Sequence, residues 1–371
     1  MRTSMPKSDL GILPLMVAIP FMFYPKVLEG DTQPWVLIGA AIALVSFRSK
    51  EFIRRRDIML ILTAMMCIVV YGLRSTLSAG LLRQAYTYVA FAILWIVCDR
   101  EKGDYFPHVV RATVVLWFAA GLFQYIAVLG GYELEMGRFM PGRSGVPSIT
   151  AEASYYGSLS MIHVMYLMGD QRRHNGIYVA CAVGSVVLSG SLLAMLLLAF
   201  PIRRLPAKYR VAAFVLFPIL VIGDYYFTSA GLVARIQAIG AQGVGASAVF
   251  MDASLNLRIG HLYFTLWKHL VPSVLMVGPI DFMAQYNAFA VQSGLFIETG
   301  SEFILPAIGE MVYGAGLFAI ALLAMVLSRA ADRCTARDLK IERVLFMLAC
   351  MLNPISLSNI FLIMYAQSRA R

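Results

Sequence analysis

The chain contains 371 residues, of which 60% are hydrophobic and only 14% are charged, and its mean hydropathy is +0.73. Soluble globular proteins average about 45–50% apolar and about 25% charged residues, so this composition excludes a soluble enzyme. Most of the basic residues behind the net charge of +10 lie in short clusters between apolar runs. Membrane topology explains such clusters, so no nucleic-acid partner is expected.

The apolar runs are long enough to cross a bilayer, and the loops between them are mostly too short to fold alone. The basic clusters alternate with poorly basic loops, which by the positive-inside rule places the clusters and the N-terminus in the cytoplasm. The sequence therefore predicts an all-α polytopic integral membrane protein with roughly 10–12 transmembrane helices in a single domain, residues 1–371. The predicted spans cover residues 10–28, 34–47, 58–73, 81–98, 109–129, 153–168, 177–200, 211–227, 302–327 and 344–366.

The run over residues 177–200 lies between two basic clusters, Arg172-Arg173 and Arg203-Arg204. It is long enough for one full crossing only, so three interpretations stay open. One basic cluster is misplaced, or the run is a single span with a Ser/Gly kink, or it is a shortened hairpin that turns at Ser189-Gly190-Ser191. Irregular backbone at that depth needs protein or a watery cavity around it. A similar break at Asn353-Pro354 leaves the side of the C-terminus open.

Motifs for metal, nucleotide or dinucleotide binding are absent, so no metal and no cofactor are expected. The informative residues are arginines that map to the external loops or to membrane ends facing them. A guanidinium stays charged and matches phosphate oxygens in a bidentate fork, so external arginines predict an anionic ligand. The alternative for each is a lipid headgroup or a nearby carboxylate. These arginines are Arg74, Arg83, Arg138, Arg143, Arg235 and Arg258.

Arg83 lies close to the start of an apolar span, where exposure to lipid would be costly. Moving an arginine toward the helix centre costs about 2.5–3.5 kcal/mol, so Arg83 is predicted to face the bundle interior.

The external loops 130–150 and 228–301 are larger than the rest and are predicted to form the active-site face. The first leads into a helix on which Glu152, Tyr156, Leu159 and His163 share one stripe. Glu152 is predicted to point into the interior from the membrane edge. In the alternative interpretation it is a first-turn carboxylate that favours the helix dipole, with Thr150 as the cap.

The second external loop contains an amphipathic segment, NLRIGHLYFTLWKHL, from Asn256 to Leu270. Helical spacing places Arg258, His261, Thr265 and His269 on one stripe, which predicts a helix at the membrane surface with its polar side toward a cavity. Arg258 and His261 are one turn apart, so a phosphate held by the arginine would be within reach of an imidazole. The alternative is an interfacial anchor built on Trp267 and Lys268.

Several short stretches together resemble one known family. Glu152-Ala-Ser-Tyr155-Tyr156-Gly157 is similar to the "E-P-S-[YF]-[YF]-[GA]" signature of bacterial O-antigen and oligosaccharide repeat-unit polymerases, with Ala153 where proline is usual. Leu188-Ser-Gly-Ser191 resembles the break in the family's next hydrophobic hairpin. Arg258 before Pro272 and Gly278-Pro279 resembles its "R…P-x-x-x-G-x-G" region in a degraded form. The span with Gly309-Glu310 and Gly314-Ala-Gly316 resembles its "E-x-G-x-x-G" span.

The resemblance implies a C-type glycosyltransferase of the bacterial inner membrane, with its active site facing the periplasm. Such a polymerase transfers glycan from undecaprenyl pyrophosphate to the terminal sugar of a new repeat unit. Glu152, His261 and Arg258 are the expected catalytic residues, with Glu152 or His261 as the base. No metal is expected to take part. Residues expected to bind the pyrophosphate or the glycan are Arg143, Arg83, Arg74, Arg138, Arg235, Tyr155 and Tyr156.

The resemblance also sets the expected partners. They are the undecaprenyl-pyrophosphate-linked oligosaccharide and membrane lipids, with a chain-length regulator as a further candidate. Arg143, Glu152 and Arg258 are expected to line one external cavity. Two other functions stay open. An O-antigen ligase would use the same donor with lipid A core as acceptor. A flippase or transporter would be expected to show inverted repeats and discontinuous helices in corresponding halves.

Overall fold

The computed structural model describes residues 37–39, 41–42, 54–75, 79–100, 105–132, 145–150, 152–169, 175–204, 253–300, 304–353, 355 and 357–368. The regular elements in this part of the chain are helices, with no strand. The predicted spans at 10–28 and 211–227, and most of the one at 34–47, lie outside the described residues.

Four of the described helices are long and apolar enough to cross a membrane. They are α3 (Arg55–Arg74), α4 (Ala79–Arg100), α5 (Tyr105–Leu129) and α16 (Ala307–Asp332). Each corresponds to a predicted span, so the prediction of an α-helical membrane protein is confirmed. The remaining helices are α6 (Ala153–Gly169), α7 (Gly176–Leu188), α8 (Leu192–Leu197), α9 (Ala199–Arg204), α13 (Ala253–Tyr263), α14 (Leu270–Val274), α15 (Phe282–Ser293), α17 (Arg337–Cys350) and α18 (Ile360–Gln367), and the π-helical turn η3 (Phe264–Lys268) joins α13 to α14.

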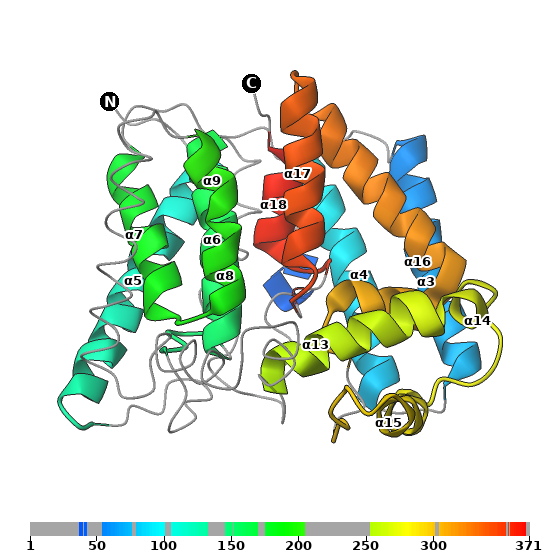
Figure 1. Cartoon of the computed structure of the whole chain (residues 1–371). Helices are drawn as coiled ribbons and strands as arrows, with labels where there is room; N and C mark the ends of the chain where they lie inside the picture. The colour runs from blue at the N-terminus through cyan, green and yellow to red at the C-terminus, as the bar shows by residue number, and fades with distance from the viewer. Residues whose placement is uncertain are drawn as a thin grey trace.

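The described helices form two groups with α18 between them (Figure 1). Helices α5 to α9 make one group, and α3, α4, α16 and α17 make the other. Helix α18 contacts α4 and α16 on one side and α6 on the other. All eight of its residues are buried, so its apolar sequence is satisfied by protein on every side.

Basic residues that are far apart in the sequence meet at one end of the bundle, which we call the basic end. The Asp99 carboxylate, at the end of α4, accepts from Arg54 at 3.1 Å, from Arg329 at 2.8 Å and from Arg333 at 2.6 Å. Three guanidinium groups around one carboxylate tie the start of α3 to the ends of α4 and α16. This pairing needs all three helices to share the same end, as the clusters in the sequence predicted.

The segment that contains α7, α8 and α9 is a hairpin, because both of its ends lie at the basic end. Before α7, the Asn175 side-chain oxygen accepts from Arg111, near the start of α5, at 2.6 Å. After the turn, Arg204 of α9 pairs with Glu342 of α17 at 2.6 Å. Gly190 makes the reversal possible with a left-handed φ of 59°.

The dimensions of this segment agree with a hairpin. Helix α7 has 13 residues, which is about 20 Å at ~1.5 Å per residue and shorter than the ~30 Å hydrocarbon core. The hairpin interpretation of residues 177–200 is confirmed, and the single kinked span is wrong.

Helices α17 and α18 form a second hairpin of the same kind. Arg343, in α17, donates to the Ser368 carbonyl at 2.6 Å, and Gln367 donates to the Trp95 carbonyl, near the end of α4, at 3.0 Å. The end of α18 therefore returns to the basic end, which decides the question that the Asn353-Pro354 break left open. At the tip of this hairpin the Asn353 amide donates to Ser158 of α6.

The first hairpin leads to a labelling prediction. In variants with a single cysteine at Gly176 or at Arg203, a membrane-impermeant maleimide is expected to react with both positions from the same side of sealed membranes. The reason is that both positions lie at the basic end of one hairpin. A cysteine at exposed Tyr132, after α5, is the opposite-side control. Reaction of the 176 and 203 positions from opposite sides would restore the single-span interpretation.

Candidate functional site

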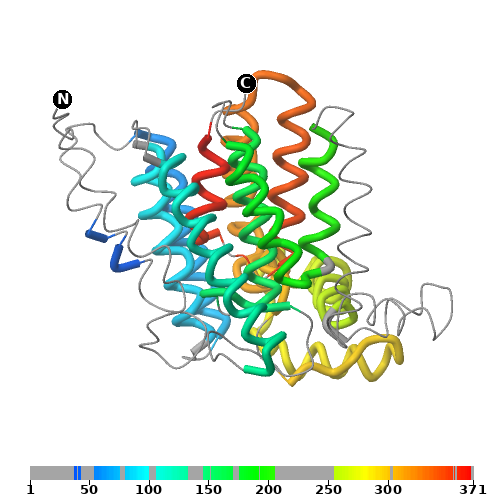
Figure 2. Tube along the Cα trace, turned by 90° about the vertical axis from the view of Figure 1, so that its left-hand side faces the viewer, coloured from blue at the N-terminus to red at the C-terminus, as the bar shows by residue number. Residues whose placement is uncertain are grey.

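The described part of the predicted external loop, residues 253–300, lies across the end of the bundle opposite the basic end. Helices α13 and α15 run crosswise to α3 and α4 in Figure 1 and stay at that end after a turn of 90° (Figure 2). Helix α14 packs on α16, close to Gly316, where a Cβ would collide with the Ser273 carbonyl. Gly316 has a φ of 53°, which breaks α16 into two helical pieces at the point of closest approach.

Arg74 is placed where this break leaves backbone carbonyls without helical partners. Its guanidinium donates to the carbonyls of Tyr313 at 2.9 Å, Gly314 at 3.2 Å and Gly278 at 3.1 Å. A cation at the carboxyl end of the first α16 piece also favours that piece's dipole. Arg74 is buried, and its hydrogen bonds connect α3 with α16 and with the loop at Gly278. Its role in the structure is therefore to hold these three segments together. The sequence had placed it among the phosphate-binding arginines.

The first piece of α16 carries Glu310, which meets two side chains of α4. The Glu310 carboxylate is hydrogen-bonded to Gln84 and interacts with the charge of Arg83. Gln84 is buried, so these contacts lie inside the bundle. Arg83 is partly buried and its charge interacts with that of Glu310, which agrees with the prediction that it faces the bundle interior. We call Arg83, Gln84 and Glu310 the α4–α16 polar cluster.

Glu310 was not among the residues selected from the sequence, although a signal for it was present. It is the one acidic residue between Pro306 and Arg329, inside an apolar run. An ionisable side chain in such a run is costly and is most often functional. It also forms part of Gly309-Glu310, one of the stretches that resemble the polymerase family.

Glu152 lies immediately before α6 and is partly buried. Ser154 donates to its carboxylate, and its carbonyl accepts from the amide of Tyr156 at 3.0 Å. Thr150 donates its hydroxyl to the carbonyls of Pro147 and Glu152. Glu152 precedes α6, whose first turn contains no acidic residue, so the first-turn alternative is wrong, and among the described contacts Thr150 makes no cap to an α6 amide.

The two tyrosines of the Glu152 signature have different surroundings. Tyr156 is fully buried, and its hydroxyl donates to the Trp117 carbonyl at 3.0 Å. Tyr156 therefore packs inside the bundle. The sequence had predicted that it contacts the substrate. Tyr155 is partly buried and lies within electrostatic range of Tyr86, one turn after Arg83 on α4. Helix α4 therefore runs past both the start of α6 and Glu310.

The stripe of α13 that carries His261 faces inward, as the amphipathic pattern predicted. The His261 side chain, however, lies against aromatic rings. Its centroid is 4.8 Å from that of Phe282 and 4.6 Å from that of Tyr286, both rings edge-on. Its Nδ1 accepts from the Leu305 amide at 3.2 Å, which places the proton on Nε2. The Nε2 atom is buried with no hydrogen-bond partner in the described chain.

This environment revises the expected role of His261. Burial lowers the pKa of the His261 imidazole from its ordinary 6.5 to about 4. Its one lone pair is already used by Leu305, so its geometry suits a structural link between α13 and the start of α16 better than a general base.

The lowered pKa predicts a pH dependence of stability. Folded His261 binds fewer protons than in the unfolded chain, so its contribution is full above about pH 6.5 and is lost as the pH falls toward 4. Thermal unfolding in detergent is expected to show a midpoint that drops between pH 7 and pH 5. His261→Asn, which can still accept from Leu305 but does not titrate, is expected to reduce that drop. His108→Gln, at an exposed histidine, should leave it unchanged, and an equal drop in both variants would contradict the assignment.

The other predicted site residues are placed only in part. Arg258 lies on α13, partly buried and one turn before His261. Arg138, Arg143 and Arg235 lie outside the described residues, and so do residues 228–252 of the loop over residues 228–301. The expected cavity between Arg143, Glu152 and Arg258 therefore stays a prediction.

Within the described ranges, no group of three or more His, Cys, Asp or Glu residues is arranged to hold a metal ion. Comparisons of the chain with protein-family models, with curated proteins and with solved structures found no match.

Proposed function

We propose that the protein is a polyprenyl-pyrophosphate-dependent glycosyltransferase that polymerises oligosaccharide repeat units. The observation that carries the proposal is the α4–α16 polar cluster, in which the charges of Arg83 and Glu310 interact between two apolar helices. Charged side chains are expensive there and are kept where they serve a substrate path. The cluster lies on the helices that end beneath the crosswise external helices, with Glu152 at the start of neighbouring α6. The polymerase-like sequence stretches give the substrate class.

The chemistry of the proposed reaction fits these residue types. The acceptor hydroxyl attacks the anomeric carbon of the donor sugar while the bond from that carbon to the pyrophosphate oxygen breaks. Negative charge then develops on the leaving pyrophosphate, and a preorganised guanidinium such as Arg83 or Arg258 stabilises it. A carboxylate takes the hydroxyl proton, and Glu152 or Glu310 is the candidate. The proposed site faces the periplasm of a bacterial inner membrane.

Deletion of the gene in its host, followed by gel analysis of lipopolysaccharide, tests the proposal. Core carrying a single repeat unit would support a polymerase, because ligation would persist without elongation. Bare core with accumulated lipid-linked polymer would assign a ligase, the closest alternative. An unchanged ladder would contradict both enzymes, and plasmid-borne wild type restoring the original ladder is the control.

A transporter of lipid-linked glycans is the second candidate, and the two hairpins favour it. Each follows a longer helix, α6 or α16, and both enter from the basic end. Discontinuous helices in corresponding halves are typical of transporters. The two hairpins have the same orientation, whereas many transporters contain repeats of inverted orientation. Accumulation of non-polymerised lipid-linked units on the inner leaflet of the deletion strain would support this candidate.

A further inference from the structure

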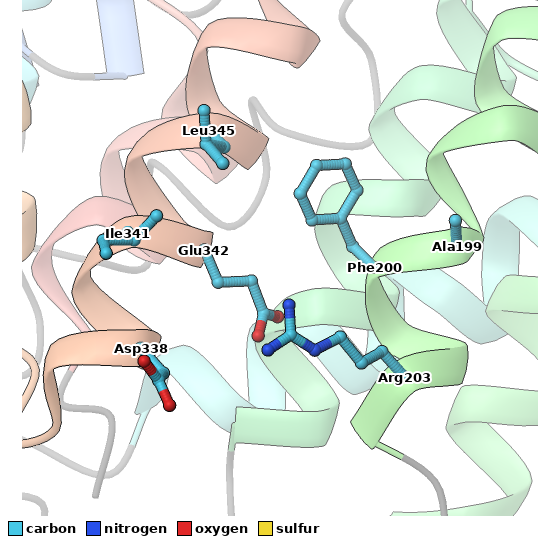
Figure 3. Close-up of a pocket in the computed structure, with 7 residues that line it drawn as sticks. All are labelled: Ala199, Phe200, Arg203, Asp338, Ile341, Glu342 and Leu345. Atoms are coloured by element: carbon cyan, nitrogen blue, oxygen red, sulfur yellow. The ribbon is translucent and has the colours of Figure 1, made fainter.

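A groove at the basic end lies between the two hairpins, and neither proposed function uses it. It has a volume of about 420 Å³, and α9 and α17 form its walls (Figure 3). The rings of Phe200 and Phe346 meet edge-on at 5.6 Å between these helices. The groove therefore has an apolar base. Its lining residues are Ala199, Phe200, Arg203, Asp338, Ile341, Glu342 and Leu345.

The apolar part of the lining continues onto the outer face of α17. Ile341 and Leu345 are one turn apart and remain 50% and 51% exposed. These two side chains sit beside the charged groups at the end of a membrane protein's helix bundle. Such a position suits the first carbons of an acyl chain, with a headgroup beyond them.

The lining of the groove carries one cation and two carboxylates. Glu342 is already paired with Arg204 at 2.6 Å. Asp338 lies in the first turn of α17, where the helix dipole favours its negative charge. Arg203 is exposed and lines the groove, and within the described ranges it has no ion pair. At the neighbouring Cys334 the interacting charges are those of Arg343, Arg204 and Lys340 against that of Glu342, so cations outnumber carboxylates on this side of α17.

We propose that this groove binds an anionic phospholipid, with the headgroup phosphate at Arg203 and an acyl chain along Ile341 and Leu345. Basic pockets between helices at the cytoplasmic end of membrane proteins have the composition for such headgroups. The proposed occupant is a lipid and not free phosphate, because the exposed apolar side chains of Ile341 and Leu345 lie next to the charged residues of the groove. Free phosphate would have no use for that apolar surface. The proposal is independent of the proposed enzymatic function.

Native mass spectrometry of the full chain in detergent, titrated with phosphatidylglycerol or phosphatidylcholine, tests this site. Phosphatidylglycerol is expected to bind more tightly to the wild type. Arg203→Ala is expected to weaken its binding about fivefold, as loss of one basic residue near a lipid headgroup implies. Leu345→Trp, which fills the groove without changing charge, is expected to weaken binding of both lipids.

The controls separate this site from general attraction between charges. Arg55→Ala removes an exposed basic residue at the same end but outside the groove, and it is expected to leave binding unchanged. A loss in Arg55→Ala as large as in Arg203→Ala would overturn the proposal. Displacement of the lipid by inorganic phosphate at equal concentration, or full binding in Leu345→Trp, would also overturn it. Circular dichroism of each variant checks that the fold is retained.

Discussion

Glu310→Gln is expected to lower glycan elongation by at least about a hundredfold while the protein still folds and inserts. Glutamine keeps the length of the side chain and a hydrogen bond to Gln84, but it can neither take a proton nor balance Arg83. The measurement is the distribution of glycan chain lengths on a gel, with membrane expression quantified in parallel. Glu298→Gln changes an exposed carboxylate after α15 and serves as the matched control. Wild-type chain lengths in a well-expressed Glu310→Gln variant would remove Glu310 from the site.

The same pair has a stability readout that does not depend on the proposed reaction. Arg83→Ala removes the cation whose charge interacts with the Glu310 carboxylate, so the free energy of unfolding is expected to fall. The double variant Arg83→Ala/Glu310→Gln is expected to recover much of that loss, since no uncompensated charge remains. Activity should stay lost in the double variant. Equal stability of the single and double variants would show that the two residues are not coupled.

Arg74→Met is expected to destabilise the protein by about 3 kcal/mol, the cost of leaving two buried carbonyls unpaired. The carbonyls are those of Tyr313 and Gly314, which the break at Gly316 deprives of helical partners. The unfolding midpoint in detergent measures the effect. Arg56→Met removes an exposed arginine from the other end of the same helix and is expected to change stability by less than about 0.5 kcal/mol. Equal midpoints for the two variants would show that the break is stable without Arg74.

The sequence predicted the positions of α3 to α6 and the existence of α16, because long apolar runs depend only on local composition. It also indicated the breaks at Ser189-Gly190-Ser191 and Asn353-Pro354. It did not decide their geometry, since the length of a run limits the number of crossings but not the direction in which the chain leaves a turn. That direction became clear only from contacts such as Arg204 with Glu342.

The site was harder to predict for a related reason. The inward polar stripe of α13 followed from its periodicity, but the rings that enclose His261 come from α15, and no local pattern specifies which surface an amphipathic helix faces. The Gly316 break was hidden because a glycine in an apolar run more often permits close helix packing than a left-handed turn. Its positive φ depends on the approach of Ser273, distant in the sequence.

The central position of α18 has a consequence for biogenesis. This helix follows every other described helix in the chain, yet it contacts both halves of the bundle and is buried throughout. During synthesis the inner faces of α4 and α6 therefore lack this partner until α18 has left the ribosome. Assembly of the two halves is expected to be a late, post-insertion step, and an interval in which a membrane chaperone or a quality-control protease can act on the unfinished protein.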